Sequence, residues 1–265
     1  MKTKLKKELD NLTTSAGDRI VALITNGAVF DKLSNILTIQ KLHKLIVFQD
    51  LELTNYKCTN LQSVLELCAK SVRVLKLENI DLRDTEKLSR QMPNMTTIEI
   101  SHCNGNAQLA AIFRMSSQSV TKVEINHIVD TALFQDLDFE MDCLRSLSIV
   151  SIKNIELTSL LQRCCNLKEL ELSAEGISTK IASNRMSSLT HMRIELIQET
   201  TLPINLINSA ASTLHSLKLG NVKVCADEDK FVKLLALKTL QLVCCSPGMI
   251  FKYRVYCCLW LLSKL

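Results

Sequence analysis

The chain has little of what marks an enzyme or a membrane protein in sequence. It contains six glycines and three prolines in 265 residues, too few glycines for a phosphate-cradling loop. The motifs G-x-G-x-x-G, G-x-x-x-x-G-K, G-x-S-x-G and H-E-x-x-H are all absent. The apolar run near the C-terminus, residues 255–262, is eight residues long, whereas a membrane-spanning helix needs about 20. The sequence therefore predicts no enzyme activity, no cofactor and no membrane partner.

Cysteines are numerous, but their pattern does not indicate disulfides or a metal site. The count of eleven is odd, and three pairs are adjacent in sequence, at 164/165, 244/245 and 257/258. No apolar signal segment follows Met1, and no C-x-x-C pair or ligand-like histidine spacing occurs. We expect reduced thiols, no bound metal and a cytoplasmic or nuclear location.

Charge and aromatic content disfavour a nucleic-acid partner. The formal net charge is +5, and four lysines in the first seven residues nearly account for it. The sequence shows no clustered basic segment interleaved with aromatic residues, which make up only 4% of the chain. The remainder is almost neutral, so we predict that the chain does not bind nucleic acid.

The chain repeats one apolar template, L-x-x-L-x-L, of which Leu167, Leu170 and Leu172 are the clearest copy. From residue 72 onward the copies start 23, 25, 24, 23, 22, 25 and 23 residues apart. A period of this length with this strand motif is typical of a leucine-rich repeat. We predict nine copies, which begin at Leu42, Val72, Met95, Val120, Leu144, Leu167, Leu189, Leu214 and Leu237.

Apolar residues at helical spacing lie between the copies and complete each repeat. They include Leu109, Ile112 and Phe113, and the same spacing recurs around residues 61–68, 84–92, 157–164, 202–206 and 231–235. Parallel strands stack about 4.8 Å apart, whereas neighbouring helices need about 8–10 Å. We therefore predict an α/β solenoid (a horseshoe) with parallel strands on its concave face and helices on its convex face.

Three segments follow from this repeat. Residues 1–41 are predicted to form an N-terminal cap, in which Ile20 begins either a degenerate tenth repeat or a buried helix. Residues 42–245 hold the repeats, and the 30-residue spacing from Leu42 to Val72 predicts a longer loop around residues 51–58. Residues 246–265 are interpreted as an apolar cap over the last repeat or as an altered terminus.

The third, fifth and seventh places of each template should point away from the core, because side chains alternate across a strand. Glutamates gather at these places on the central repeats, which predicts a groove for a protein partner with a basic surface. The alternative is a solvated face with partly compensating charges. The predicted partner-binding residues are Glu78, Glu99, Glu124, Glu169, Glu171, Arg193, Glu195 and Lys218.

The cysteines give the repeats a family resemblance. Cys164 stands three residues before Leu167, and the pattern L-x-L-x-x-C ends at Cys103 and Cys245. Ile128, Val129 and Asp130 resemble an I-T-D turn, and the segment from Met92 to Met95 is similar to a C-P-x-L entry. These features resemble the cysteine-containing leucine-rich repeats of F-box/LRR proteins, which are substrate receptors of cullin-based ubiquitin ligases.

The resemblance covers residues 42–245 and implies a non-enzymatic protein-interaction module with a cullin-ligase association. An F-box begins with Leu-Pro, and no proline precedes Pro93, so no docking module for the ligase is seen. The alternative functions are a stand-alone scaffold and a regulator of an enzyme, both unconnected to ubiquitin.

Overall fold

The fold is known from a computed structural model, which divides into two compact units described separately below. Unit 1 comprises Met1–Leu133 and Asp138–Leu144, and unit 2 comprises Phe134–Leu137 and Arg145–Leu265. The structure describes residues 20–26, 46–57, 65, 69–83, 91–128, 137–151, 153–178, 186–201, 204–223 and 234–245.

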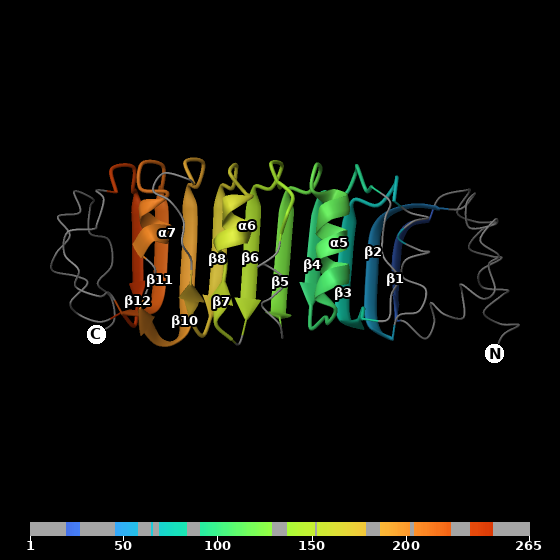
Figure 1. The fold of residues 1–265 in the computed structure, drawn as a ribbon, viewed down its shortest axis with the longest axis horizontal. Coiled ribbons are helices and arrows are strands. Elements are labelled where there is room, and N and C mark those ends of the chain that lie inside the picture. The colour runs from blue at the N-terminus through green and yellow to red at the C-terminus, as the bar shows by residue number, and fades with distance from the viewer. Residues whose placement is uncertain are drawn as a thin grey trace, which may run out of the picture. The chain divides into compact units, whose positions relative to one another are not determined.

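The described part of unit 1 contains five strands that pair in parallel, each with the next one along the chain (Figure 1). The templates that begin at Val72, Met95 and Val120 lie in register, so Leu75, Ile98 and Val123 stand opposite one another. One helix, α5 (Asn106–Ser116), follows β4. The strands are β1 (Ile20–Asn26), β2 (Ile46–Lys57), β3 (Val74–Asp81), β4 (Thr97–Ser101) and β5 (Lys122–Ile128).

Unit 2 repeats this arrangement with five further parallel strands among its described residues. Leu170 stands opposite Leu147 on one side and Met192 on the other. The strands are β6 (Ser146–Ser151), β8 (Glu169–Ala174), β10 (His191–Thr201), β11 (Ser216–Lys223) and β12 (Thr239–Val243). The other elements are α6 (Thr158–Gln162), α7 (Ile204–Asn208) and a two-stranded sheet of β7 (Ile155–Glu156) and β9 (Ile177–Ser178).

The core of each unit is built from the first, fourth and sixth places of the template, as the period predicts. Leu167, Leu170 and Leu172 are at most 2% exposed, and the same places are buried in the copies from Val72 to Leu214. In the last copy Leu237 is buried, while Leu240 and Leu242 are half-buried. The predicted α/β leucine-rich-repeat solenoid is confirmed.

The helical faces predicted between the strands are confirmed where the structure describes them, with one exception. Leu109, Ile112 and Phe113 of α5 are buried, as are the apolar residues of α6 and Leu206 of α7. In Figure 1, α5 lies over the strands of unit 1, and α6 and α7 lie over the strands of unit 2. The face predicted around residues 231–235 is wrong at its described end, because Leu235 lies in a turn and is 82% exposed. Residues 84–90, and all but Leu65 of residues 61–68, lie outside the described part.

The first repeat lies in a different register from the predicted one. The pairing of β2 with β3 places Leu51 opposite Leu75 and Leu53 opposite Leu77. The first copy of the template therefore starts at Phe48, 24 residues before Val72. The predicted copy at Leu42, Leu45 and Val47 and the predicted loop at residues 51–58 are wrong, since residues 51–57 belong to β2. A phenylalanine in the first place hid the template, and the apolar residues 45–47 offered a competing register.

The chain before this repeat also forms a strand where it is described. β1 pairs in parallel with β2, with Leu23 opposite Leu51 and Thr25 opposite Leu53. This strand agrees with a degenerate repeat that begins at Ile20, and it contradicts a buried helix at that place. The limits of the two caps, at residues 41 and 246, stay predictions, and residues 246–265 lie outside the described part.

Several repeats share a turn geometry, at or near the ends of their strands, that the template does not reveal. In five repeats the eighth residue has a positive φ of 51° to 56°, although none of these residues is glycine. Asparagine and histidine adopt this left-handed conformation more often than most residues, which explains four of the five. The residues are Asn79, His102, His127, Asn221 and Cys244. His102 and His127 stack with ring centroids 4.3 Å apart.

The cysteine that follows this turn has a structural role. The Cys103 thiol donates to the carbonyl of Leu77 at 3.5 Å and to that of Ser101 at 3.3 Å. The Cys245 thiol makes the equivalent bonds to Leu219 and Val243, both at 3.5 Å. Burial raises the pKa of the Cys103 thiol. The L-x-L-x-x-C pattern therefore marks a thiol that joins two neighbouring repeats.

Candidate interaction face of the strands

Each unit presents a strand face, which we define as the side chains at the third, fifth and seventh places of its repeats. These side chains are exposed or half-buried, in alternation with the buried fourth and sixth places. The alternation follows from the opposite directions of successive side chains in a strand. With few exceptions these residues are polar, so the strand face takes no part in the core.

The strand face of unit 1 is organised by two ion pairs. Lys76 Nζ lies 2.9 Å from Glu99 Oε2 across the β3–β4 pair. Lys122 Nζ lies 2.6 Å from Glu124 Oε1 on the same strand, β5. The hydrogen bond to Glu99 raises the pKa of Lys76, and the charges of Glu99, Glu52 and Glu124 add to this effect against partial desolvation. The hydrogen bond to Glu124 likewise raises the pKa of Lys122.

Two further glutamates extend this face beyond the ion pairs. The β2–β3 register places Glu52 opposite Lys76 and Thr54 opposite Glu78, so the two glutamates lie on adjacent strands two places apart. Glu52 is half-buried and Glu78 is exposed. Neither forms an ion pair within the described residues. The two lysines compensate two of the four glutamate charges, so the strand face of unit 1 keeps a net negative charge.

The strand face of unit 2 centres on Arg193. Its Nη1 lies 2.9 Å from Glu171 Oε1 on β8, and its Nη2 lies 3.0 Å from Glu195 Oε2 on β10. All three side chains are between 45% and 48% exposed, so the guanidinium is held in a fixed orientation at the surface. Glu169 stands opposite His191, and Lys218 stands opposite Arg193 on β11.

Small side chains surround the Glu171–Arg193–Glu195 group. Gly220 stands opposite Glu195, and a Cβ at this glycine would lie 3.2 Å from Glu195 Cγ. The glycine therefore leaves room for the glutamate side chain to reach Arg193. The other small residues at outward places of unit 2 are Ser146, Ser148, Ser173 and Ser216.

All eight predicted residues lie at outward places, but the structure divides them between the two units. Unit 1 carries Glu78, Glu99 and Glu124, and unit 2 carries the other five. Four of the six glutamates already form ion pairs: Glu99, Glu124, Glu171 and Glu195. Sequence reasoning missed Glu52 because of the register error, and it did not connect Lys76 and Lys122 with the glutamates beside them.

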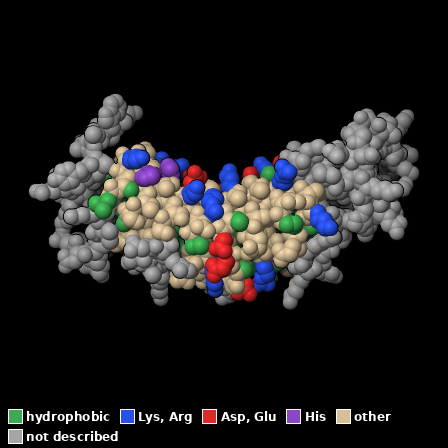
Figure 2. All heavy atoms as spheres, turned by 90° about the horizontal axis from the view of Figure 1, so that it is seen from above, with side chains coloured by type: hydrophobic (Ala, Val, Ile, Leu, Met, Phe, Trp, Pro, Cys, Tyr) green, Lys and Arg blue, Asp and Glu red, His purple; other side chains and the backbone are tan. Residues whose placement is uncertain are grey.

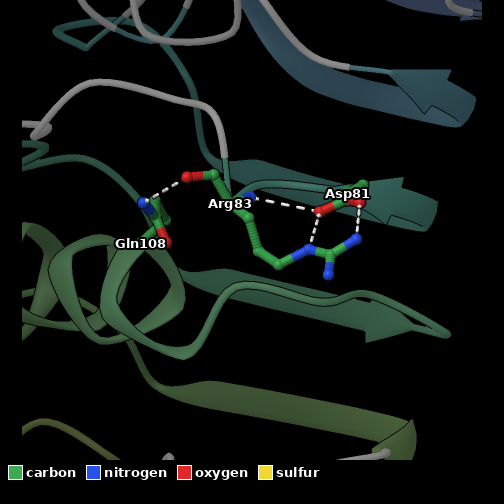
Figure 3. Close-up of polar contacts among 3 residues, drawn as sticks. All are labelled: Asp81, Arg83 and Gln108. Carbon is green, nitrogen blue, oxygen red and sulfur yellow. Dashed lines mark hydrogen bonds and ion pairs between the residues drawn. The ribbon is translucent and has the colours of Figure 1, made fainter.

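One further polar group ties unit 1 together at the end of β3 (Figure 3). Arg83 Nε donates to Asp81 Oδ1 at 2.8 Å, its second guanidinium nitrogen donates to Oδ2, and its backbone N–H donates to Oδ1 at 3.2 Å. Gln108 Nε2 of α5 donates to the Arg83 carbonyl at 3.4 Å. The group fixes the turn between β3 and the residues that follow.

The described residues contain neither a cluster of metal-ligating side chains nor a membrane-spanning helix. Within the ranges given above, no three His, Cys, Asp or Glu side chains gather as metal ligands. The six cysteines in those ranges are free thiols, and the number of free thiols in the whole chain stays a prediction. No helix there is long and apolar enough to cross a bilayer.

Comparison with known proteins gives a likeness of fold and no relative in sequence. No protein-family model matches the chain, and no curated protein matches it. Among solved structures the chain is similar to an internalin from Listeria monocytogenes, at a TM-score of 0.45 and 15% sequence identity. The likeness covers 83% of this chain and 69% of the internalin chain. The strand registers, independently of that likeness, establish that this chain folds as an α/β leucine-rich-repeat solenoid.

Proposed function

We propose that the protein is a non-enzymatic protein-interaction module that binds its partner through the strand faces. The supporting observation is the set of ordered ion pairs on faces that contribute nothing to the core. Holding Arg193 between two carboxylates presents both signs of charge in a fixed arrangement, which suits selection of a complementary protein surface. A cytoplasmic or nuclear location remains part of this proposal.

The partner is proposed to carry a basic surface. The strand face of unit 1 has four glutamates, Glu52, Glu78, Glu99 and Glu124, against the two lysines. The strand face of unit 2 has three glutamates against Arg193 and Lys218. Each face is therefore negative on balance. Charges at the rim of an interface act mainly on the association rate and on its salt dependence.

The finer proposal is that the module resembles the substrate-recognition part of an F-box/LRR ubiquitin-ligase receptor. It is supported by Cys103 and Cys245, which join neighbouring repeats at the place where the family's pattern has cysteine. The competing proposal is a stand-alone scaffold or enzyme regulator without ubiquitin. Affinity purification of the full chain from cells separates the two, because recovery of cullin-ligase subunits supports the receptor and their absence supports the scaffold.

A charge-reversal experiment tests whether the strand faces are the binding surface. Glu78→Lys and Glu169→Lys change exposed glutamates that form no ion pair within the described residues. Asp138→Lys is the control, since Asp138 is an exposed acid outside the strands, and the ion pair that this change breaks is with Arg114 of α5 and not with a strand-face residue. If the proposal holds, the recovered partner associates more slowly with the first two variants and its binding loses salt sensitivity. Equal slowing by Asp138→Lys would place the binding surface elsewhere.

A further inference from the structure

We propose that unit 2 carries a second interaction surface, at the edge where its strands begin, and that this edge binds an extended acidic protein segment. The surface is distinct from the strand face and has the opposite charge. We define the basic edge as the second residues of five successive repeats: Arg145, Lys168, Thr190, His215 and Lys238.

Backbone hydrogen bonds make the basic edge a continuous row. The Lys168 N–H donates to the Arg145 carbonyl at 2.8 Å, and the Thr190 N–H donates to the Lys168 carbonyl at 2.9 Å. The His215 N–H donates to the Thr190 carbonyl, and the Lys238 N–H donates to the His215 carbonyl, both at 2.8 Å. Neighbouring parallel strands lie about 4.8 Å apart, so the four steps span about 19 Å.

The basic residues are not required by the fold at this place. Threonine occupies it in three repeats, and the hydroxyls of Thr96, Thr121 and Thr190 donate to the carbonyl of the preceding repeat at 3.1 to 3.2 Å. The corresponding row of unit 1 reads Arg73, Thr96 and Thr121 and so carries one charge. A neutral residue that bonds the backbone therefore suffices structurally, and the charge in unit 2 serves a different purpose.

The two lysines of the basic edge are available to a partner. Lys168 and Lys238 are exposed, and neither forms an ion pair within the described part of unit 2. His215 is half-buried between them. Arg145 Nη1 donates to the Asn166 carbonyl at 3.2 Å, which orients the guanidinium along the same edge.

The acidic side chains described for unit 2 lie largely away from this edge. Glu171 and Glu195 are held by Arg193 on the strand face, and Glu156 and Glu175 follow the carboxyl ends of β6 and β8. Glu169, next to Lys168 in sequence, is the exception and belongs to the strand face. Figure 2 looks onto the end where the strands begin, and basic and histidine side chains lie together over the C-terminal strands at its left.

The shape and composition of the basic edge favour a protein segment over nucleic acid. The turns that form it, residues 164–168, 186–190, 211–215 and 234–238, contain no Phe, Tyr or Trp, so they lack the rings on which unpaired bases stack. They contain hydroxyl groups, such as those of Ser187 and Ser188, which suit carboxylates. An extended segment of about six residues spans the row, with alternate acidic side chains about 7 Å apart on one side.

Fluorescence anisotropy with a labelled oligoglutamate peptide of about ten residues, a length that exceeds the row, tests the proposal on the full chain. Lys168→Glu is compared with Lys153→Glu, because both lysines are exposed in unit 2 and both changes alter the net charge equally. Lys153 follows β6, at the other end of the strands. We expect wild type to bind at low ionic strength, Lys168→Glu to weaken binding at least about fivefold, and Lys153→Glu to leave it unchanged.

Three results would overturn the proposal. They are no binding of oligoglutamate by wild type, an equal loss in Lys153→Glu, and tighter binding of an oligothymidylate strand than of oligoglutamate. The neutral variant Lys168→Gln guards against a folding defect, since it should weaken binding less than Lys168→Glu while keeping the wild-type unfolding temperature. Neither lysine lies on a strand face, so the outcome is independent of the proposed partner for those faces.

Discussion

The ammonium group of Lys76 on β3 lies 2.9 Å from a carboxylate oxygen of Glu99 on β4. This cross-strand pair converts what the sequence presents as an acidic row into a partly neutralised one. Reversing the charge of Glu99 would therefore break an internal ion pair as well as alter the surface. Glu52 and Glu78, on the same face, can be changed without breaking an ion pair within the described residues, and they report partner binding more cleanly.

The first prediction concerns high pH. The pKa of Lys76 and that of Lys122 are raised above the ordinary value of 10.5 by their glutamate partners. A raised pKa contributes stability that is complete below the unfolded-state value and is lost as pH rises through the folded-state value. Both side chains are more than a third exposed, so the loss should be below about 1 kcal/mol.

Urea unfolding of wild type and Lys76→Met, at neutral pH and above pH ~11, measures this contribution. We expect the stability of wild type to fall more than that of the variant. Lys70→Met, which removes an exposed lysine in the same unit, should retain the wild-type decline. An unchanged decline in Lys76→Met would show that the ion pair contributes nothing.

The second prediction tests the core of unit 2. Leu170 is 2% exposed and lies between Leu147 and Met192. Leu170→Asp would bury an unpaired carboxylate between two repeats, at a cost of about 3–5 kcal/mol. Thermal unfolding should show a large drop in midpoint, whereas Glu169→Gln, at the neighbouring outward place, should stay within about 0.5 kcal/mol of wild type.

The third prediction tests the corrected register of the first repeat. Leu53 stands opposite Leu77 in the β2–β3 pair, while Leu45 precedes β2. Leu53→Asp should therefore destabilise the protein by several kcal/mol, because the pairing puts residue 53 at the sixth place of the template, where the neighbouring Leu77 is buried. Leu45→Asp should cost less. A larger loss of stability in Leu45→Asp would restore the register that begins at Leu42.

The period of the leucines was enough to predict the fold from Val72 onward, because three buried places per repeat constrain the register strongly. Leu167, Leu170 and Leu172 show this, with every neighbour in phase. The period is hidden at Phe48, where one aromatic residue replaces the expected aliphatic one beside a competing apolar run. Glu52 was then missed, since an outward place is known only once the register is known.

The charges of the candidate face were predicted by place but not by pairing. Sequence spacing locates Arg193, Glu171 and Glu195 at outward places of two repeats, yet it does not say that one guanidinium reaches both carboxylates. That contact depends on side-chain conformation and on the room left by Gly220. The left-handed turn at His102 and His127 was missed for a related reason, because a positive φ is uncommon for any residue other than glycine and residue type alone does not fix it.

The fourth prediction concerns thiol reactivity. Cys103 and Cys164 are 6% and 0% exposed, and burial raises the pKa of the Cys103 thiol. Thiolate is the reactive form, so both cysteines should react slowly with iodoacetamide in the folded protein. Cys244 is exposed and should react much faster. Peptide mapping by mass spectrometry gives the order, and equal rates at Cys103 and Cys244 would contradict the burial of Cys103.

The fifth prediction concerns Arg193. Its guanidinium separates the carboxylates of Glu171 and Glu195, which lie on adjacent strands of the same face. Arg193→Met would leave the two negative charges facing each other, with the loss of two charge-assisted hydrogen bonds. We expect a destabilisation of about 1 kcal/mol at low ionic strength, since all three groups are nearly half exposed. Salt should relieve this loss, because mobile ions screen repulsion between exposed charges.

Thermal unfolding across a series of salt concentrations measures the effect, with Lys218→Met as the matched control. Lys218 stands next to Arg193 on β11 and forms no ion pair within the described residues, so its removal should show no such salt dependence. If both variants respond to salt alike, the destabilisation comes from the net charge of the face, and Arg193 has no special role in holding Glu171 and Glu195 together.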